Sequence, residues 1–160
     1  MSQNYNFDFA KTGLYCNLEE RPRHFQEYVS HVIAIAKLFD VYSIADFGAG
    51  NGTLCIALAK AGISEVYSVD IESENASFAG SRYVNEGVEP CIHQITPLYF
   101  VKCKTLFDMV CSFGTLEHLE NPMRTIHQIW ETIRPGGLFI LHADLHNFEG
   151  PSIFDHYIYE

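Results

Sequence analysis

Basic residues are scarce in this sequence. Its 160 residues include 10 Lys and Arg against 20 Asp and Glu, which gives a formal net charge of −10 with the histidines neutral. A surface with that balance repels nucleic-acid phosphates and anionic membranes unless its few cations are clustered. The nearest approach to a cluster is the pair Lys102 and Lys104. We therefore expect no nucleic acid and no membrane among the partners.

Paired cysteines and long apolar runs are also missing. The five cysteines are odd in number and none forms a Cys-x-x-Cys pair. Cys55 and Cys111 lie in apolar runs, where cysteine behaves as a small hydrophobe. No apolar run reaches the length of a transmembrane helix, and residues 1–13 lack the apolar centre of a signal peptide. These absences predict a cytoplasmic protein with reduced thiols.

Apolar residues make up 48% of the chain, which favours one globular domain with a buried core. Apolar runs predict strands over 42–47, 65–69, 91–95, 107–113 and from 138 onward, and helical spacing predicts helices over 23–39, 54–61, 73–86 and 122–133. Helices that alternate with continuously apolar strands predict an α/β fold, a Rossmann-like, doubly wound and mostly parallel sheet with helices on both faces. Ligands bind such sheets at the carboxyl ends of the strands.

The periodic pattern divides the chain into three segments. Residues 1–22 are mixed and aromatic, and we expect them to form an N-terminal arm or lid. Residues 23–146 form the predicted ligand-binding core, and residues 147–160 form a C-terminal tail.

A glycine-rich stretch, Asp46-Phe47-Gly48-Ala49-Gly50-Asn51-Gly52, follows the first predicted strand. Such a loop lets a ligand approach the backbone closely, although a tight turn without a ligand has the same composition. Nicotinamide dinucleotide sites require Gly-x-Gly-x-x-Gly, and the third glycine position counted from Gly48 holds Thr53. This departure disfavours a nicotinamide oxidoreductase, which stays as an alternative, and favours another adenosine-bearing ligand.

Asp70 ends the second predicted strand, 22 residues after Gly48. A carboxylate at this place can accept hydrogen bonds from both hydroxyls of a ribose. The alternative role is a helix N-cap, in which aspartate is favoured.

Four blocks of the sequence together resemble the class I S-adenosylmethionine-dependent methyltransferases, within the broad group of ubiquinone-pathway and small-molecule enzymes. The blocks are residues 46–52, Asp70, Phe107–Leu119 and Ile133–Leu138, and the resemblance covers about residues 25–145. It implies S-adenosylmethionine as the cofactor. That cofactor carries a sulfonium and no phosphate, and no Lys or Arg lies between Lys37 and Lys60.

The resemblance also implies roles for individual residues. Asp46 and the backbone of Gly48, Ala49, Gly50 and Gly52 would hold the methionine end, Asp70 the ribose, and Ile71 the adenine, with Ser112 and Phe113 lining the cofactor from the opposite side. The family often has an acidic residue after the third strand that binds the adenine amino group. Here the sequence reads His93-Gln94-Ile95-Thr96-Pro97, so the adenine contacts stay unassigned.

Methyl transfer to oxygen requires removal of the acceptor's proton, and a histidine suits this task near neutral pH. His118, beside Glu117 just beyond the fourth strand, is the candidate general base; the alternative is that this pair only caps or positions the loop. The Asn-Pro-Pro-Tyr type of motif, typical of amide- and base-methylating enzymes, is missing after the fourth strand. We therefore expect a small-molecule substrate that accepts the methyl group on oxygen, and a non-catalytic or truncated S-adenosylmethionine-binding domain is the alternative.

His142, Asp144 and His146 alternate at strand spacing and could bind zinc together with Glu117 or His118. A polar strand exit at the mouth of the pocket explains the same pattern, and we assign no metal. Small-RNA 2′-O-methyltransferases have a second metal-binding glutamate where this chain has Gly114.

The family core has seven strands in the order 3-2-1-4-5-7-6, whereas 14 residues follow His146 here. We therefore expect five strands, with the last two missing and the fifth at an exposed edge, which invites pairing with other chains. The tail is apolar at Ile153, Phe154, Tyr157, Ile158 and Tyr159. The expectation is either a shortened form of a longer protein or a homodimer through the fifth strand and the tail.

Overall fold

The computed structural model describes residues 17–71 and 74–143. Most of the expected arm, Asp144, His146 and the tail lie outside the described residues, so the predictions that concern them are not addressed by the fold.

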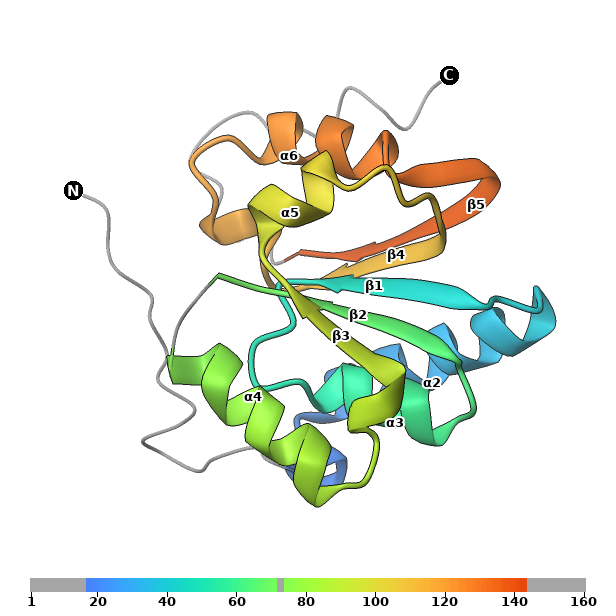
Figure 1. The fold of residues 1–160 in the computed structure, drawn as a ribbon, viewed down its shortest axis with the longest axis vertical. Helices are drawn as coiled ribbons and strands as arrows, with labels where there is room; N and C mark the ends of the chain where they lie inside the picture. Colours follow the sequence, from blue (N-terminus) through green and yellow to red (C-terminus); the bar gives the residue numbers. More distant parts are fainter. Residues whose placement is uncertain (1–16, 72–73, 144–160) are drawn as a thin grey trace.

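Five parallel strands form a single sheet in the order β3-β2-β1-β4-β5 (Figure 1). Their bounds are β1 Ser43–Phe47, β2 Glu65–Val69, β3 Ile92–Ile95, β4 Phe107–Phe113 and β5 Ile133–His142. The chain adds β2 and β3 on one side of β1 and then β4 and β5 on the other. This reversal leaves a crevice at the carboxyl ends of β1 and β4, where ligands bind in such sheets. The predicted doubly wound α/β fold is confirmed.

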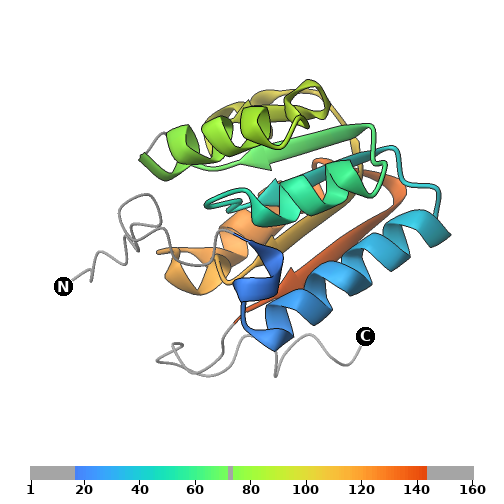
Figure 2. The same cartoon turned by 90° about the horizontal axis from the view of Figure 1, so that it is seen from below.

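The helices cover both faces of the sheet (Figures 1 and 2). One face carries α2 Arg23–Leu38, α3 Thr53–Lys60 and α4 Glu74–Asn85, and the other carries α5 Pro97–Lys102 and α6 Pro122–Trp130. Short 3-10 turns occur at η1 Leu18–Glu20, η2 Glu89–Cys91 and η3 Leu116–His118. None of the helices in the described part of the chain is long and apolar enough to cross a membrane.

The spacing of apolar residues explains how α2 packs. Phe25, Val29, Val32 and Ala36 recur at helical intervals and are all buried against the sheet. The opposite face has a separate core under α5 and α6, in which the rings of Phe100 and Phe107 stack at 5.4 Å. Two cores on two faces make the sheet a rigid platform for its carboxyl edge.

The structure differs from the predictions around α6 and β5. In the helix predicted over 122–133, the apolar residue Trp130 is 64% exposed, and Ile133 begins β5 instead of ending the helix. The strand runs through the Pro-Gly-Gly stretch, which we expected to come before it, and its register shifts there. A Cβ on Gly137 would lie 2.9 Å from the carbonyl oxygen of Asp108, so glycine lets the two strands approach.

The helix α5 was not predicted from the sequence. It has six residues, too few for a helical period to be distinguished from a loop. Thr96 caps it by accepting a hydrogen bond from the amide of Tyr99 at 3.2 Å.

Candidate functional site

The loop after β1 has a conformation that requires glycine. Gly48 and Gly52 have φ angles of +85° and +76°, which residues with side chains rarely adopt. A Cβ on Gly48 would collide with the Thr115 side chain, and one on Gly52 with the Tyr83 ring. The amide of Gly48 donates to the carbonyl of Val69 at 2.8 Å, which ties the loop to the end of β2. The packing therefore fixes this backbone.

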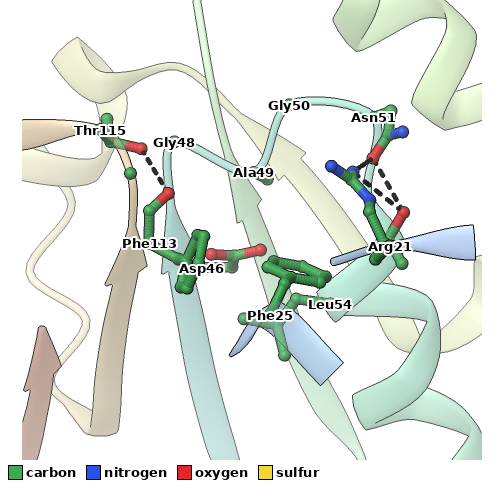
Figure 3. Close-up of a pocket in the computed structure, with 12 residues that line it drawn as sticks. Arg21, Phe25, Asp46, Gly48, Ala49, Gly50, Asn51, Leu54, Phe113 and Thr115 are labelled. Carbon is green, nitrogen blue, oxygen red and sulfur yellow. Dashed lines mark hydrogen bonds between the residues drawn. The ribbon is translucent and has the colours of Figure 1, made fainter. Parts of the chain in front are cut away.

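A cavity of about 220 Å³ opens beside the loop (Figure 3). The Asp46 carboxylate lies at its floor, with Phe25 of α2 and Phe113 of β4 nearby. Its lining comprises Arg21, Phe25, Asp46, Gly48, Ala49, Gly50, Asn51, Thr53, Leu54, Phe113, Gly114 and Thr115. The fold thus brings five of the predicted cofactor-binding residues around one space: Asp46, Gly48, Ala49, Gly50 and Phe113.

The carboxyl group of Asp46 is almost fully buried, with 3% of the residue exposed. Burial raises its pKa to about 7, and repulsion from Asp70 acts in the same direction. A hydrogen bond from the Cys55 thiol, 3.5 Å away, and the charge of Arg21 act against the shift. Ionisation of the Asp46 carboxyl group therefore costs free energy unless a cation lies next to it.

Arg21, between η1 and α2, is a site residue that the sequence analysis missed. Its guanidinium donates to Asn51 Oδ1 at 2.6 Å and to Thr53 Oγ1 at 3.3 Å, and it lies 4.8 Å from the centroid of the Phe25 ring. From α4, Arg82 donates to the carbonyl of Asn51 at 2.5 Å. Two guanidinium groups thus hold the junction of the loop and α3. These contacts span about thirty residues of sequence, so no local pattern reveals them.

Asp70 connects the loop to the end of β2. Its carboxylate accepts hydrogen bonds from the amides of Gly50 at 2.6 Å and Ile71 at 2.7 Å. Burial raises its pKa, although both amide hydrogen bonds lower it. The group thus lies next to the glycine loop, as the spacing of the motifs predicts.

A second, larger and mainly apolar cavity of about 560 Å³ also borders Gly48. Asp70 and Ile71 line it from the end of β2, and Leu98 and Val101 line it from α5. Gly48 and Thr115 line both cavities. Both cavities therefore border the carboxyl end of β1. The smaller one is the more polar of the two, since Arg21, Asp46 and Asn51 line it, and we call it the polar cavity; the larger one is the apolar cavity.

Two other predicted cofactor residues, Ser112 and Gly52, line neither of these two cavities. Ser112 is fully buried and donates from its hydroxyl to the carbonyl of Phe47 at 2.9 Å, so it joins β4 to β1 beneath the site. Gly52 is the N-cap residue of α3, and a Cβ at this position would collide with the Tyr83 ring. Thr96, in the stretch after β3 where the family often has its adenine-binding acid, lines a smaller cavity with Asp70 and Gln94.

The candidate catalytic pair, Glu117 and His118, lies in η3 just beyond β4. His118 is exposed, and its amide donates to the carbonyl of Thr115 at 3.0 Å. Neither residue lines either of the two cavities that meet at Gly48. The role of His118 as general base therefore stays a prediction.

A metal site finds no support among the residues that the structure covers. His142 ends β5, whereas Asp144 and His146 lie outside the described residues. Residues 17–71 and 74–143 contain no group of three or more His, Cys, Asp or Glu side chains placed to hold a metal ion.

Comparison with protein families identifies this arrangement. A family model described as a methyltransferase domain matches residues 45–141, from β1 through most of β5. The chain belongs to this methyltransferase family. The resemblance of the four sequence blocks to class I S-adenosylmethionine-dependent methyltransferases is thereby confirmed.

Methyltransferases of ubiquinone biosynthesis are among its curated relatives. The mitochondrial ubiquinone biosynthesis O-methyltransferase of Dictyostelium discoideum is 29% identical over 105 residues, covering 59% of this chain and 33% of that protein. The corresponding enzyme of Rickettsia canadensis is 29% identical over 116 residues, covering 72% of this chain and 47% of the relative. The chain thus spans a third to a half of the length of these relatives.

Solved structures share the fold. The O-methyltransferase TomG of Streptomyces achromogenes, solved with S-adenosylmethionine, aligns with a TM-score of 0.62 at 20% identity over 72% of this chain and 54% of TomG. An O-methyltransferase of Bacillus cereus, solved with S-adenosylhomocysteine, aligns with a TM-score of 0.63 at 16% identity over 72% and 55% of the two chains.

Proposed function

We propose that this chain binds S-adenosylmethionine and transfers its methyl group to an oxygen atom of a small-molecule acceptor. The observation that carries the proposal is the meeting of a polar and an apolar cavity at Gly48, with a carboxylate beside each. S-adenosylmethionine has the matching halves, a charged amino-acid end and a flat adenine. The family membership and the ligands of the solved relatives support the same cofactor.

The polar cavity fits the methionine end. It contains one cation, Arg21, and one buried carboxyl group, Asp46, which suit the carboxylate and the ammonium of an amino acid. The raised pKa of Asp46 supports this assignment, because an ammonium beside it would stabilise the ionised form. The glycine backbone offers amides without side chains to obstruct the ligand.

The apolar cavity fits the nucleoside. Asp70 lines it and is placed to accept hydrogen bonds from ribose hydroxyls, while Ile71 and Leu98 offer apolar surface to the adenine. Ile71 is 57% exposed and Leu98 65%, which is costly for large aliphatic side chains in the absence of a ligand.

The chemistry requires alignment and one proton acceptor. S-adenosylmethionine, when bound, supplies a methyl group on a sulfonium; an acceptor oxygen forms the new C–O bond, the S–C bond breaks, and the acceptor's proton leaves. Holding the reactants in line supplies much of the acceleration. The relatives named as O-methyltransferases support oxygen as the acceptor atom, and Glu117 and His118 are retained as candidates for the proton step.

The proposal extends to location and partners. The four cysteines in the described part of the chain are free thiols, which supports a reducing cytoplasm. The acidic charge argues against nucleic acid and anionic membranes as partners. At the β5 edge of the described sheet, Leu138, Phe139, Ile140 and Leu141 are all only half-buried, which supports a second copy as partner. Light scattering coupled to size-exclusion chromatography would show twice the chain mass; a monomer would contradict this part.

The experiment that tests the function has two stages. Calorimetry with S-adenosylmethionine, S-adenosylhomocysteine and NAD should show binding of the first two and none of the third. Production of S-adenosylhomocysteine is then measured with small phenolic acceptors such as catechol. Binding without turnover of any acceptor would favour the non-catalytic module instead.

A further inference from the structure

Three flat rings from three separate elements gather beside the polar cavity. The Phe113 and His142 rings stack at 4.2 Å with an interplanar angle of 12°. The His24 ring lies nearly parallel to both, 5.9 Å from Phe113 and 6.2 Å from His142. Phe113 itself lines the cavity, so both imidazoles lie next to a residue of its wall.

The backbone fixes both histidines in this place. His142 is the register partner of Phe113 in the β4–β5 pair, and its carbonyl accepts a hydrogen bond from the Gly114 amide at 2.9 Å. His24 lies in the first turn of α2, between the cavity residues Arg21 and Phe25. Both histidines are exposed, so an incoming molecule can reach them.

A structural role alone accounts poorly for the arrangement. Stacking on Phe113 could be achieved by any flat side chain, and it contributes about 1 kcal/mol. Two exposed imidazoles packed beside Phe113, a residue of the cavity wall, instead place ring nitrogen atoms close to the space in which an acceptor could bind. Imidazole is the side chain whose unperturbed charge change lies nearest to neutral pH.

Resting on the proposed methyl transfer, we propose that His142 accepts the proton of the acceptor hydroxyl, and that His24 forms the facing wall that positions the acceptor. The acceptor oxygen forms its bond to the methyl carbon as the S–C bond breaks. The hydroxyl proton passes to the ring nitrogen of His142 and then to solvent. The products are the methyl ether, S-adenosylhomocysteine and one proton.

This assignment competes with His118. Neither His118 nor His142 lines either of the two cavities, but the His142 ring stacks at 4.2 Å on Phe113, which lines one of them. The two assignments can be distinguished. Only the histidine that accepts the proton should respond when a ligand carries a different group at the position of the transferred methyl.

The first test uses two ligands that differ at that position. Sinefungin carries an amino group where S-adenosylmethionine carries the methyl, and S-adenosylhomocysteine carries neither. The imidazole NMR signals of His142 should shift when sinefungin replaces S-adenosylhomocysteine, while those of His31, an exposed histidine further along α2, should not. By calorimetry, His142→Gln should weaken sinefungin by about tenfold with little change for S-adenosylhomocysteine, and His31→Gln should change neither.

The second test separates a proton acceptor from a packing residue. With catechol as acceptor, His142→Gln should lower kcat by about 100-fold. With 4-nitrocatechol, whose hydroxyl ionises far more readily, the loss should be under about tenfold; a packing defect would lower both equally. His24→Gln should raise KM for the acceptor and leave kcat nearly unchanged.

The outcomes distinguish the inference from the function on which it rests. If neither ligand binds the unsubstituted protein, the proposed function fails. If both ligands bind but the His142 signals are identical in the two complexes, the inference fails alone. A shift confined to His118 would assign the proton step to η3.

Discussion

The two sides of the polar cavity differ in how firmly their residues are held. On the loop side, Asp46, Asn51 and Thr53 are at most 4% exposed. Arg21 and Arg82 donate hydrogen bonds to Asn51, and the Cys55 thiol donates to Asp46. On the β4–β5 side, the candidate proton acceptors His118 and His142 are exposed. The comparison teaches that the loop side, where we propose that S-adenosylmethionine binds, is a prearranged surface. The side that would select the acceptor is left open, where substitution costs little stability.

The largest expected effect concerns the loop side of the cavity and the dependence of stability on pH. The pKa of Asp46 is raised from 3.8 to about 7, so the folded protein retains a proton that the unfolded chain loses above about pH 4. Stability should therefore fall as pH rises from 4 to 7, by on the order of 4 kcal/mol for a shift of about three pKa units. Asp46→Asn should remove this loss and stabilise the ligand-free protein at pH 8, as measured by urea unfolding at pH 4 and pH 8.

Asp108, at the opposite end of the sheet, is the matched control for that measurement. Burial opposes ionisation, but the amides of Ser43 and Tyr42, together with Arg134, lower its pKa overall. Asp108→Asn should therefore destabilise the protein at pH 8, the opposite sign. Equal effects of the two substitutions on stability would mean that the pKa of Asp46 is not raised in the folded protein.

The second prediction tests the prearranged backbone. Gly48→Ala places a Cβ against Thr115 at a φ of +85°, and strain with overpacking should cost about 3 kcal/mol. S-adenosylhomocysteine affinity should fall more than about 100-fold. Gly62→Ala is the control, because its φ of +95° is equally unfavourable but its Cβ meets nothing within 4 Å. Similar losses in both variants would show that backbone strain alone acts.

The third prediction concerns the β4–β5 side of the cavity. If His118 is the general base, His118→Ala should lower turnover about 100-fold and leave S-adenosylhomocysteine affinity nearly intact. The exposed His127 of α6 supplies a control substitution. Parallel losses in turnover and affinity would instead indicate that His118 supports the structure of η3.

The smallest expected effect is at Asp70, which lines the apolar cavity. Asp70→Ala should weaken S-adenosylmethionine at least about tenfold, since hydrogen bonds to a carboxylate contribute about 1.5–3 kcal/mol. Glu131→Ala, an exposed acidic residue after α6, corrects for the change in net charge. Calorimetry that finds equal affinities in a folded Asp70 variant would remove the ribose assignment.

Local patterns predicted the parts of the molecule that depend on neighbours in sequence. The five strands, the glycine loop and the position of Asp70 follow from apolar runs and short spacings, and the structure brings them together. Arg21 and the stack of Phe113 on His142 depend on contacts between distant segments, which periodicity does not encode. The predicted start of β5 is too far along the sequence, because Pro-Gly-Gly usually ends a helix or strand. Here Gly137 lets β5 pass close to β4, so the strand continues through this stretch.

The placement of β4 beside β1 has a consequence for how the protein folds. All five strands are parallel, so no pair can form through a tight hairpin, and the hydrogen bond from Ser112 to Phe47 joins residues 65 positions apart. Closing loops of that length is slow relative to forming local contacts. The contact between Gly48 and Thr115, which both cavities share, can form only after β4 has docked. Ligand binding during refolding should therefore lag behind the appearance of the spectroscopic signal of the helices. It reports the time at which β4 pairs with β1.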